Sequence, residues 1–213
     1  MLLNVHMNIK EKMITIDELS SKTLYSVLID NLYIPPTSQT YFENIYGKQK
    51  WEDIYLLPRI LTKDTRVQCF QYKILQNTLF LNARLVHCNF SDTALCLLCN
   101  NFNETPVHLF HDCEVTNSLW NDLKSFFHPL IDLSNLTPQS ALFGFAVKDE
   151  DFILKNHILL LFKYCVYKYR TDNLTFHTIL SKIKSTFLIE KNIYMHNTNV
   201  FDKKWKKVSC LLH

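Results

Sequence analysis

Four side chains that commonly bind metals lie close together in the middle of the chain. Cys96 and Cys99 are separated by two residues, and His108 and Cys113 follow with four residues between them. Thiolate sulfur and imidazole nitrogen at such spacings are the ligands of a tetrahedral structural zinc ion. The pattern C-x2-C-x8-H-x4-C therefore predicts that these four residues bind Zn2+ as cofactor.

Two alternatives remain open for this segment. The three cysteines and the histidine can be ordinary buried side chains that hold no metal. His111 can also take the place of His108, but a single residue between His111 and Cys113 is shorter than the usual spacing of a second ligand pair. We therefore expect His108 to be the ligand, with His111 exposed or next to the ligands.

The residues between the two ligand pairs predict a chain reversal followed by a short helix. Asn100 comes directly after the first pair, and asparagine tolerates the left-handed backbone better than other residues with a side chain. Thr105 followed by Pro106 is the pattern of a helix N-cap with proline at the first helical position. His108 and Cys113 are then expected on one side of that helix.

A wider set of residues around the ligands follows a family pattern. The set comprises Cys96-Leu97-Leu98-Cys99, Glu104-Thr105, His108-Leu109-Phe110, Cys113 and Leu119-Trp120, with Pro36-Thr37-Ser38-Gln39, Tyr41-Phe42, Leu56-Leu57-Pro58 and residues 70–75 upstream and residues 138–145 downstream. From about Pro36 to Phe145 the chain resembles the C-terminal zinc-binding (CCHC) region of reverse transcriptases from LINE-type (non-LTR) retrotransposons.

This resemblance implies a region that follows the polymerase and helps to hold the element RNA or the target DNA. The chain contains no Y-x-D-D motif, so the catalytic carboxylates of a polymerase are absent from it, and no nuclease set is found. Only Gly47 and Gly144 are present, which excludes glycine-rich phosphate loops. We interpret the acidic run at residues 149–151 as a helix start. The chain is thus expected not to be an enzyme and to resemble a detached tail of a reverse transcriptase.

Apolar residues recur at helical spacing in several stretches, which predicts a mainly α fold. The expected helices span residues 17–32, 37–46, 51–57, 63–77, 79–88, 115–127, 151–170 and 175–194. We expect an irregular helical domain with a small CCHC zinc module inserted between helices, and at most a short hairpin at the zinc turn. The predicted segments are an N-terminal helical region (13–93), the zinc module with its following helix (94–128), a C-terminal helical region (129–195) and a basic tail (196–213).

Positive charge is concentrated at the C-terminal end. Residues 173–213 hold 7 lysines and 2 acids, whereas residues 1–172 hold 16 basic and 18 acidic residues. Lysines can neutralise phosphates, and an exposed tryptophan can stack on an unpaired base. The residues predicted to contact nucleic acid are Lys203, Lys204, Trp205, Lys206, Lys207, Lys182, Lys184, Arg66 and Lys73. Two alternatives remain: the lysine run is a solvated, disordered end, or Trp205 only anchors the tail to the core.

The sequence also indicates where the chain is located in the cell. No secretory signal is found and no apolar run approaches the ~20 residues of a membrane span, so we expect a nuclear or cytoplasmic chain that is neither secreted nor in a membrane. Cys69 and Cys165 lie among apolar neighbours and are expected to be buried.

The leading hypothesis is a module that binds RNA or DNA, with a polymerase region as a further partner. The alternative is a zinc-stapled protein-interaction module or an inactive relic of an element.

Overall fold

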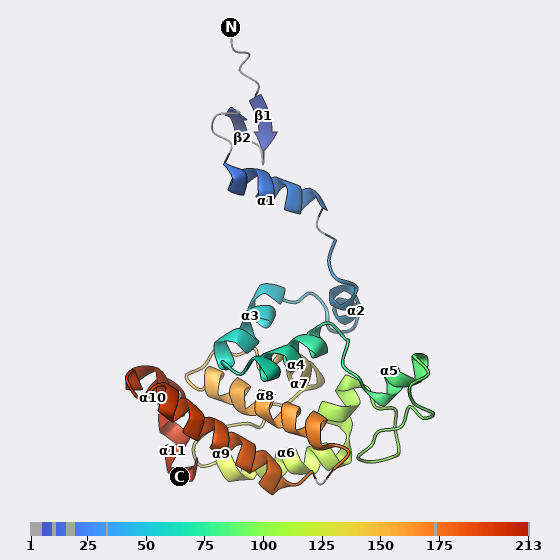
Figure 1. Cartoon of the computed structure of the whole chain (residues 1–213), viewed down its shortest axis with the longest axis vertical. Coiled ribbons are helices and arrows are strands. Elements are labelled where there is room, and N and C mark those ends of the chain that lie inside the picture. The colour runs from blue at the N-terminus through green and yellow to red at the C-terminus, as the bar shows by residue number, and fades with distance from the viewer. Residues whose placement is uncertain (1–5, 10–11, 16–19, 33, 173, 213) are drawn as a thin grey trace.

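A computed structural model describes residues 6–9, 12–15, 20–32, 34–172 and 174–212. The elements in chain order are β1 (His6–Ile9), β2 (Lys12–Thr15), α1 (Ser21–Leu32), α2 (Thr37–Tyr46), α3 (Trp51–Leu61), α4 (Thr65–Leu75), α5 (Asn82–His87), the π-helix η2 (His108–Asp112), α6 (Glu114–Phe127), α7 (Pro138–Phe143), α8 (Phe152–Tyr169), α9 (Phe176–Ile193), α10 (Thr198–Trp205), the 3-10 helix η3 (Lys206–Val208) and α11 (Ser209–Leu212) (Figure 1). The predicted mainly α fold is confirmed.

Helix α8 lies at the centre of the helical body, in contact with α3, α4, α9, α10 and η2 (Figure 1). Its residues 158–162 are all at most 2% exposed, as expected of a helix that is apolar on every side. Phe162 meets Trp120 of α6 with ring centroids 5.0 Å apart. One hydrophobic cluster contains buried residues of all four predicted segments, from Phe42 in α2 to Leu212 in α11.

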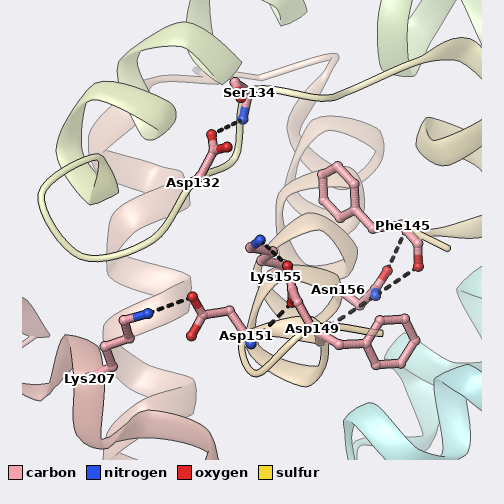
Figure 2. A network of polar contacts seen from close by, with 9 residues as sticks. Asp132, Ser134, Phe145, Asp149, Asp151, Lys155, Asn156 and Lys207 are labelled. Atoms are coloured by element: carbon pink, nitrogen blue, oxygen red, sulfur yellow. Dashed lines mark hydrogen bonds and ion pairs between the residues drawn. The ribbon is translucent and has the colours of Figure 1, made fainter. Parts of the chain in front are cut away.

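The acidic run before α8 fixes the start of that helix. The side chain of Asp149 accepts a hydrogen bond from the backbone N–H of Asp151 at 3.1 Å and pairs with Lys155 at 2.6 Å (Figure 2). In the same region Asn156 binds both the N–H and the carbonyl of Phe145, at 2.8 and 3.2 Å. The run therefore begins a helix, as predicted, and Phe145 is held as an anchor.

The differences from the sequence-based expectation include a longer third helix and an additional helix. The third expected helix was to stop at Pro58, but α3 continues to Leu61, because Leu57 and Leu61 both bury their side chains there. Between the expected helices 115–127 and 151–170 the structure contains an additional helix, α7, which begins with a capping box. Thr137 and Ser140 bind each other's backbone N–H groups, and Pro138 occupies the first turn. The T-P-x-S sequence carried this signal.

The N-terminal part contains a β-hairpin, which was not predicted, and helix α1, which was. Residues 6–9 and 12–15 pair as an antiparallel hairpin at an end of the chain for which no strand was expected. Residues 1–5 and 10–11 of that end, and the expected helix start at residues 17–19, lie outside the described residues. Helix α1 forms, but Leu24, Leu28 and Leu32 are 40%, 55% and 72% exposed, so the described residues leave much of its apolar face uncovered (Figure 1).

Several side chains lie elsewhere than predicted. In α2 the apolar residue Phe42 is buried together with Ser38 and Gln39, whereas Tyr41 and Ile45 are exposed. Cys165 is buried as expected, whereas Cys69 is exposed. Among the described helices, none combines the length and the apolar character needed to cross a membrane.

Candidate metal centre

The side chains of Cys96, Cys99, His108 and Cys113 converge on one point. The two sulfurs of Cys96 and Cys113 are 4.0 Å apart, the sulfur of Cys99 lies 3.3 Å from Nε2 of His108, and all four donor atoms lie within 4.8 Å of one another. Around tetrahedral zinc with bonds of about 2.0–2.3 Å, neighbouring ligands are about 3.5–3.8 Å apart. The donor set and its spacing therefore fit zinc.

The first ligand pair lies on a tight turn closed by backbone hydrogen bonds. The N–H of Cys96 donates to the carbonyl of Phe102 at 2.7 Å, and the N–H of Asn100 donates to the carbonyl of Cys96 at 2.9 Å. Asn100 has φ +55°, the left-handed conformation that the sequence predicts. Leu95 and Asn103 form a single antiparallel bridge at the base of the turn. Strand pairing at the zinc turn is thus limited to this one bridge, and the expectation was at most a short hairpin there.

Backbone N–H groups inside the turn point at the two sulfurs. Burial raises the pKa of the Cys96 thiol to about 12, although the N–H groups of Cys99 and Leu98 donate to its sulfur. For Cys99 burial also acts to raise the pKa, but the N–H groups of Asn101 and Phe102 outweigh it and the pKa is lowered. A metal coordinated by Cys96 would stabilise the thiolate form and so act against this effect of burial.

The second ligand pair is positioned by a capped, widened helical turn. Thr105 accepts a hydrogen bond from the backbone N–H of His108 at 3.1 Å, as its predicted N-cap role requires. In η2 the N–H of Cys113 then donates to the carbonyl of His108 at 2.7 Å, five residues back. A π-turn of this kind places both donors on one side and is frequent at functional sites. His111 points elsewhere and pairs with Asp112 at 2.6 Å.

A buried carboxylate joins the turn to the helical body, and no role was predicted for it. Glu104 is fully buried, and its oxygens accept from the backbone N–H groups of Asn82 at 2.8 Å and Leu97 at 3.4 Å. Nε of Arg170, at the end of α8, lies 3.3 Å from the same carboxylate. In the sequence, the one indication of such a role was that Glu104 is the only acidic, lysine or arginine residue in the stretch 93–111.

The structure corrects the stacking role predicted for Trp205. Its ring is fully buried, and its Nε1 donates to Glu190 at 2.6 Å. Lys204 is also largely covered: its ammonium binds Glu190 at 2.8 Å and the carbonyl of Leu61 at 2.6 Å. The alternative in which Trp205 anchors the C-terminal segment describes this arrangement, because an aromatic ring with an acceptor for its N–H gains more from burial than from exposure.

The other predicted nucleic-acid contacts lie at the surface in different electrostatic settings. Arg66 and Lys182 share the carboxylate of Asp64, at 3.4 and 3.7 Å, which brings α4 and α9 together. Lys207 pairs with Asp151 at 2.6 Å (Figure 2). The remaining lysines are exposed or half-buried and have no acidic partner among the described residues; they are Lys73, Lys184, Lys203 and Lys206.

Comparison with known families agrees with this geometry. Residues 38–120 match the model of a family described as zinc-binding in reverse transcriptase. The cofactor is zinc. The match contains all four donor residues and ends at Trp120, and the helices that follow α6 lie outside it. It covers a zinc-binding region and no catalytic polymerase region. No curated protein matches the chain.

Proposed function

We propose that this chain is a nucleic-acid-binding zinc module of the kind that follows the polymerase in LINE-type reverse transcriptases. It holds element RNA or target DNA and has no polymerase activity of its own. The observation that carries the proposal is the convergence of three thiols and one imidazole within a region similar to a reverse-transcriptase zinc-binding family. With four protein donors the CCHC site is closed, so the zinc acts structurally.

Exposed aromatic rings at the zinc turn and shortly before it in the sequence support contact with unpaired bases. Phe80, Phe90 and Phe102 are 57%, 81% and 65% exposed, and Phe102 lies 5.6 Å from the ring of His108. Base stacking on aromatic side chains is the common way in which proteins hold single-stranded nucleic acid, and it tolerates any base. These rings provide the stacking surface that the buried Trp205 does not.

The test is binding of the zinc-loaded chain to single-stranded RNA, single-stranded DNA and duplexes by fluorescence anisotropy. Removal of one base stack costs about 1–3 kcal/mol, so F90A and F102A should weaken single-strand binding by about fivefold or more. Tyr41→Ala removes a 51% exposed ring outside the zinc turn and serves as the control. A zinc-loaded chain without affinity for any of these nucleic acids at low salt would sink the proposal.

The charge contribution is tested by salt titration. Lys203 and Lys206 are exposed, whereas Lys204 is engaged in the core, so K203Q and K206Q are the informative changes. For a single strand, removing one lysine that neutralises a phosphate should flatten the slope of log affinity against log salt by about 0.7. An unchanged slope removes the C-terminal segment from the interface and leaves the zinc turn as its centre.

A protein-interaction module is the second candidate, and one observation favours it. The exposed face of α1 carries Leu24, Tyr25, Leu28, Ile29 and Leu32, each at least 40% exposed. Contiguous exposed apolar residues are typical of protein contacts, and a reverse transcriptase polymerase region is the partner that this reading proposes. L28D should then abolish association with the polymerase region and leave nucleic-acid affinity unchanged.

A further inference from the structure

A small pocket next to the zinc site is lined by hydrogen-bond donors and belongs to none of the sites described above. It has a volume of about 150 Å³ and lies between η2, α6 and residues 134–136. Its polar lining consists of His111, Asn117, Asn121, Lys124 and Ser134. Because His111 stands between the ligands His108 and Cys113, one wall of the pocket is built by the metal-binding turn itself.

Helix α6 and the following loop present the lining groups toward a common space. Asn117, Asn121 and Lys124 follow one another at intervals of four and three residues, so they form one stripe on α6. On the other side, the backbone N–H of Ser134 donates to the carboxylate of Asp132 at 2.8 Å, which turns the chain back there (Figure 2). The ring of His111 is fixed by its 2.6 Å contact with Asp112.

The chemistry of this lining suits an anion. Every polar side chain of the lining can donate a hydrogen bond, and no carboxylate belongs to it. Lys124 is half-buried and makes no ion pair with any described residue, so its charge is not balanced within the described chain. Trp120 also lines the pocket, and its buried indole N–H has no hydrogen-bond partner within the described part of the chain. A volume of about 150 Å³ has room for more than one water molecule and therefore for a small anion such as phosphate.

We propose that this pocket binds a phosphate group, with Lys124 as the counter-charge and Asn117, Asn121 and Ser134 as donors. The inference rests on the proposed function, in which the phosphate belongs to the backbone of bound RNA or DNA. Inorganic phosphate has the same chemistry and is the alternative source. Because η2 forms one wall, zinc also shapes the phosphate site, so chelation of zinc weakens phosphate binding.

The first arm of the test uses inorganic phosphate alone. NMR titration of the zinc-loaded full chain should give saturable shifts of the side-chain amides of Asn117 and Asn121 at millimolar phosphate. K124Q should abolish these shifts, whereas K191Q, which changes an exposed lysine on α9 outside the pocket, should keep them. Equal shifts in K124Q, or no saturable shift in the parent chain, would overturn phosphate binding here.

The second arm uses nucleic acid and separates the two sources. K124Q should weaken single-strand binding about three- to tenfold and flatten the salt slope by about 0.7, with the zinc content unchanged. Asn121→Leu keeps the side-chain size, removes a donor and tests the same pocket if K124Q fails to fold. If both variants keep the parental affinity and salt slope, the pocket does not bind a phosphate of the RNA or DNA backbone. If the parent chain binds no nucleic acid, the proposed function fails, and the phosphate titration alone decides on the pocket.

Discussion

The zinc module (residues 94–113) and the C-terminal junction (Glu190, Lys204 and Trp205) bury polar groups in opposite ways. The zinc module brings three thiols and an imidazole together with no protein cation among them. The junction places the Glu190 carboxylate against Lys204 at 2.8 Å and the indole N–H of Trp205 at 2.6 Å. The junction is therefore complete within the chain, whereas the zinc module depends on a bound ion.

Lys163 shows what happens when neither solution is present. Its ammonium is buried in α8, 2.8 Å from the side-chain oxygen of Gln71 and 3.3 Å from the carbonyl of Leu142, and it forms no ion pair with a described carboxylate. Burial lowers the pKa of Lys163 to about 7. A buried charge can be balanced by a metal, by an opposite side chain or by a change of protonation, and burial shifts Lys163 toward the last of these.

Removal of zinc should have the largest effect on stability, and the resulting loss of structure should be confined to the zinc module. Structural zinc contributes about 10 kcal/mol or more in small zinc domains, and the described residues place no other cation among these ligands. We expect chelation to abolish hydrogen-exchange protection of the amides of Cys96, Asn100 and Cys113, while α8 and α9 keep theirs. Cys113→Ser should lose zinc, and Cys69→Ser, which changes an exposed thiol, should retain it. Protection that survives chelation would show that the module folds without metal.

Trp205→Ala should break the junction and leave the zinc module intact. Truncation of a fully buried tryptophan costs about 3–5 kcal/mol, measured by urea unfolding, with the zinc content unchanged. Trp205→Phe keeps an aromatic ring and removes only the N–H that Glu190 accepts, so it should cost about 1–3 kcal/mol. If Trp205→Ala kept the parental free energy of unfolding, the ring would not be part of the stabilising core.

The same contrast explains which features the sequence could predict. The four ligands lie within 18 residues, so their spacing alone brings them together, and α9 was expected within a residue of its true ends. The exposure of Trp205 depends instead on Glu190 and on the packing of α10 against α8 and α9, which local composition does not specify. The ion pair of Glu104 was equally difficult to predict, because its partner Arg170 is distant in the chain.

The Lys163 site predicts a pH dependence with a definite sign. In the folded chain Lys163 loses its proton near pH 7, whereas the unfolded chain keeps it up to the ordinary value of 10.5, so the unfolded state binds more protons in between. The free energy of unfolding should therefore rise with pH, by up to about 4 kcal/mol between pH 7 and pH 10. Lys163→Met should remove this rise, and Lys191→Met, at an exposed position, should keep it. Parallel profiles for the parent chain and Lys163→Met would contradict the buried neutral amine.

Glu104→Gln should have the smallest effect and shows how far the zinc module depends on the helical body. Glutamine keeps an acceptor for the N–H of Asn82 or Leu97 and removes the charge that faces Arg170, at a cost of about 2 kcal/mol. We expect faster hydrogen exchange at Asn82 and Leu97 with zinc still bound. The control is Asp92→Asn, an exposed acid just before the module, which should change stability by less than about 0.5 kcal/mol. If zinc were lost together with the Glu104 charge, the metal site and its docking contact would be one cooperative unit, and the contrast between the two regions would be one of degree.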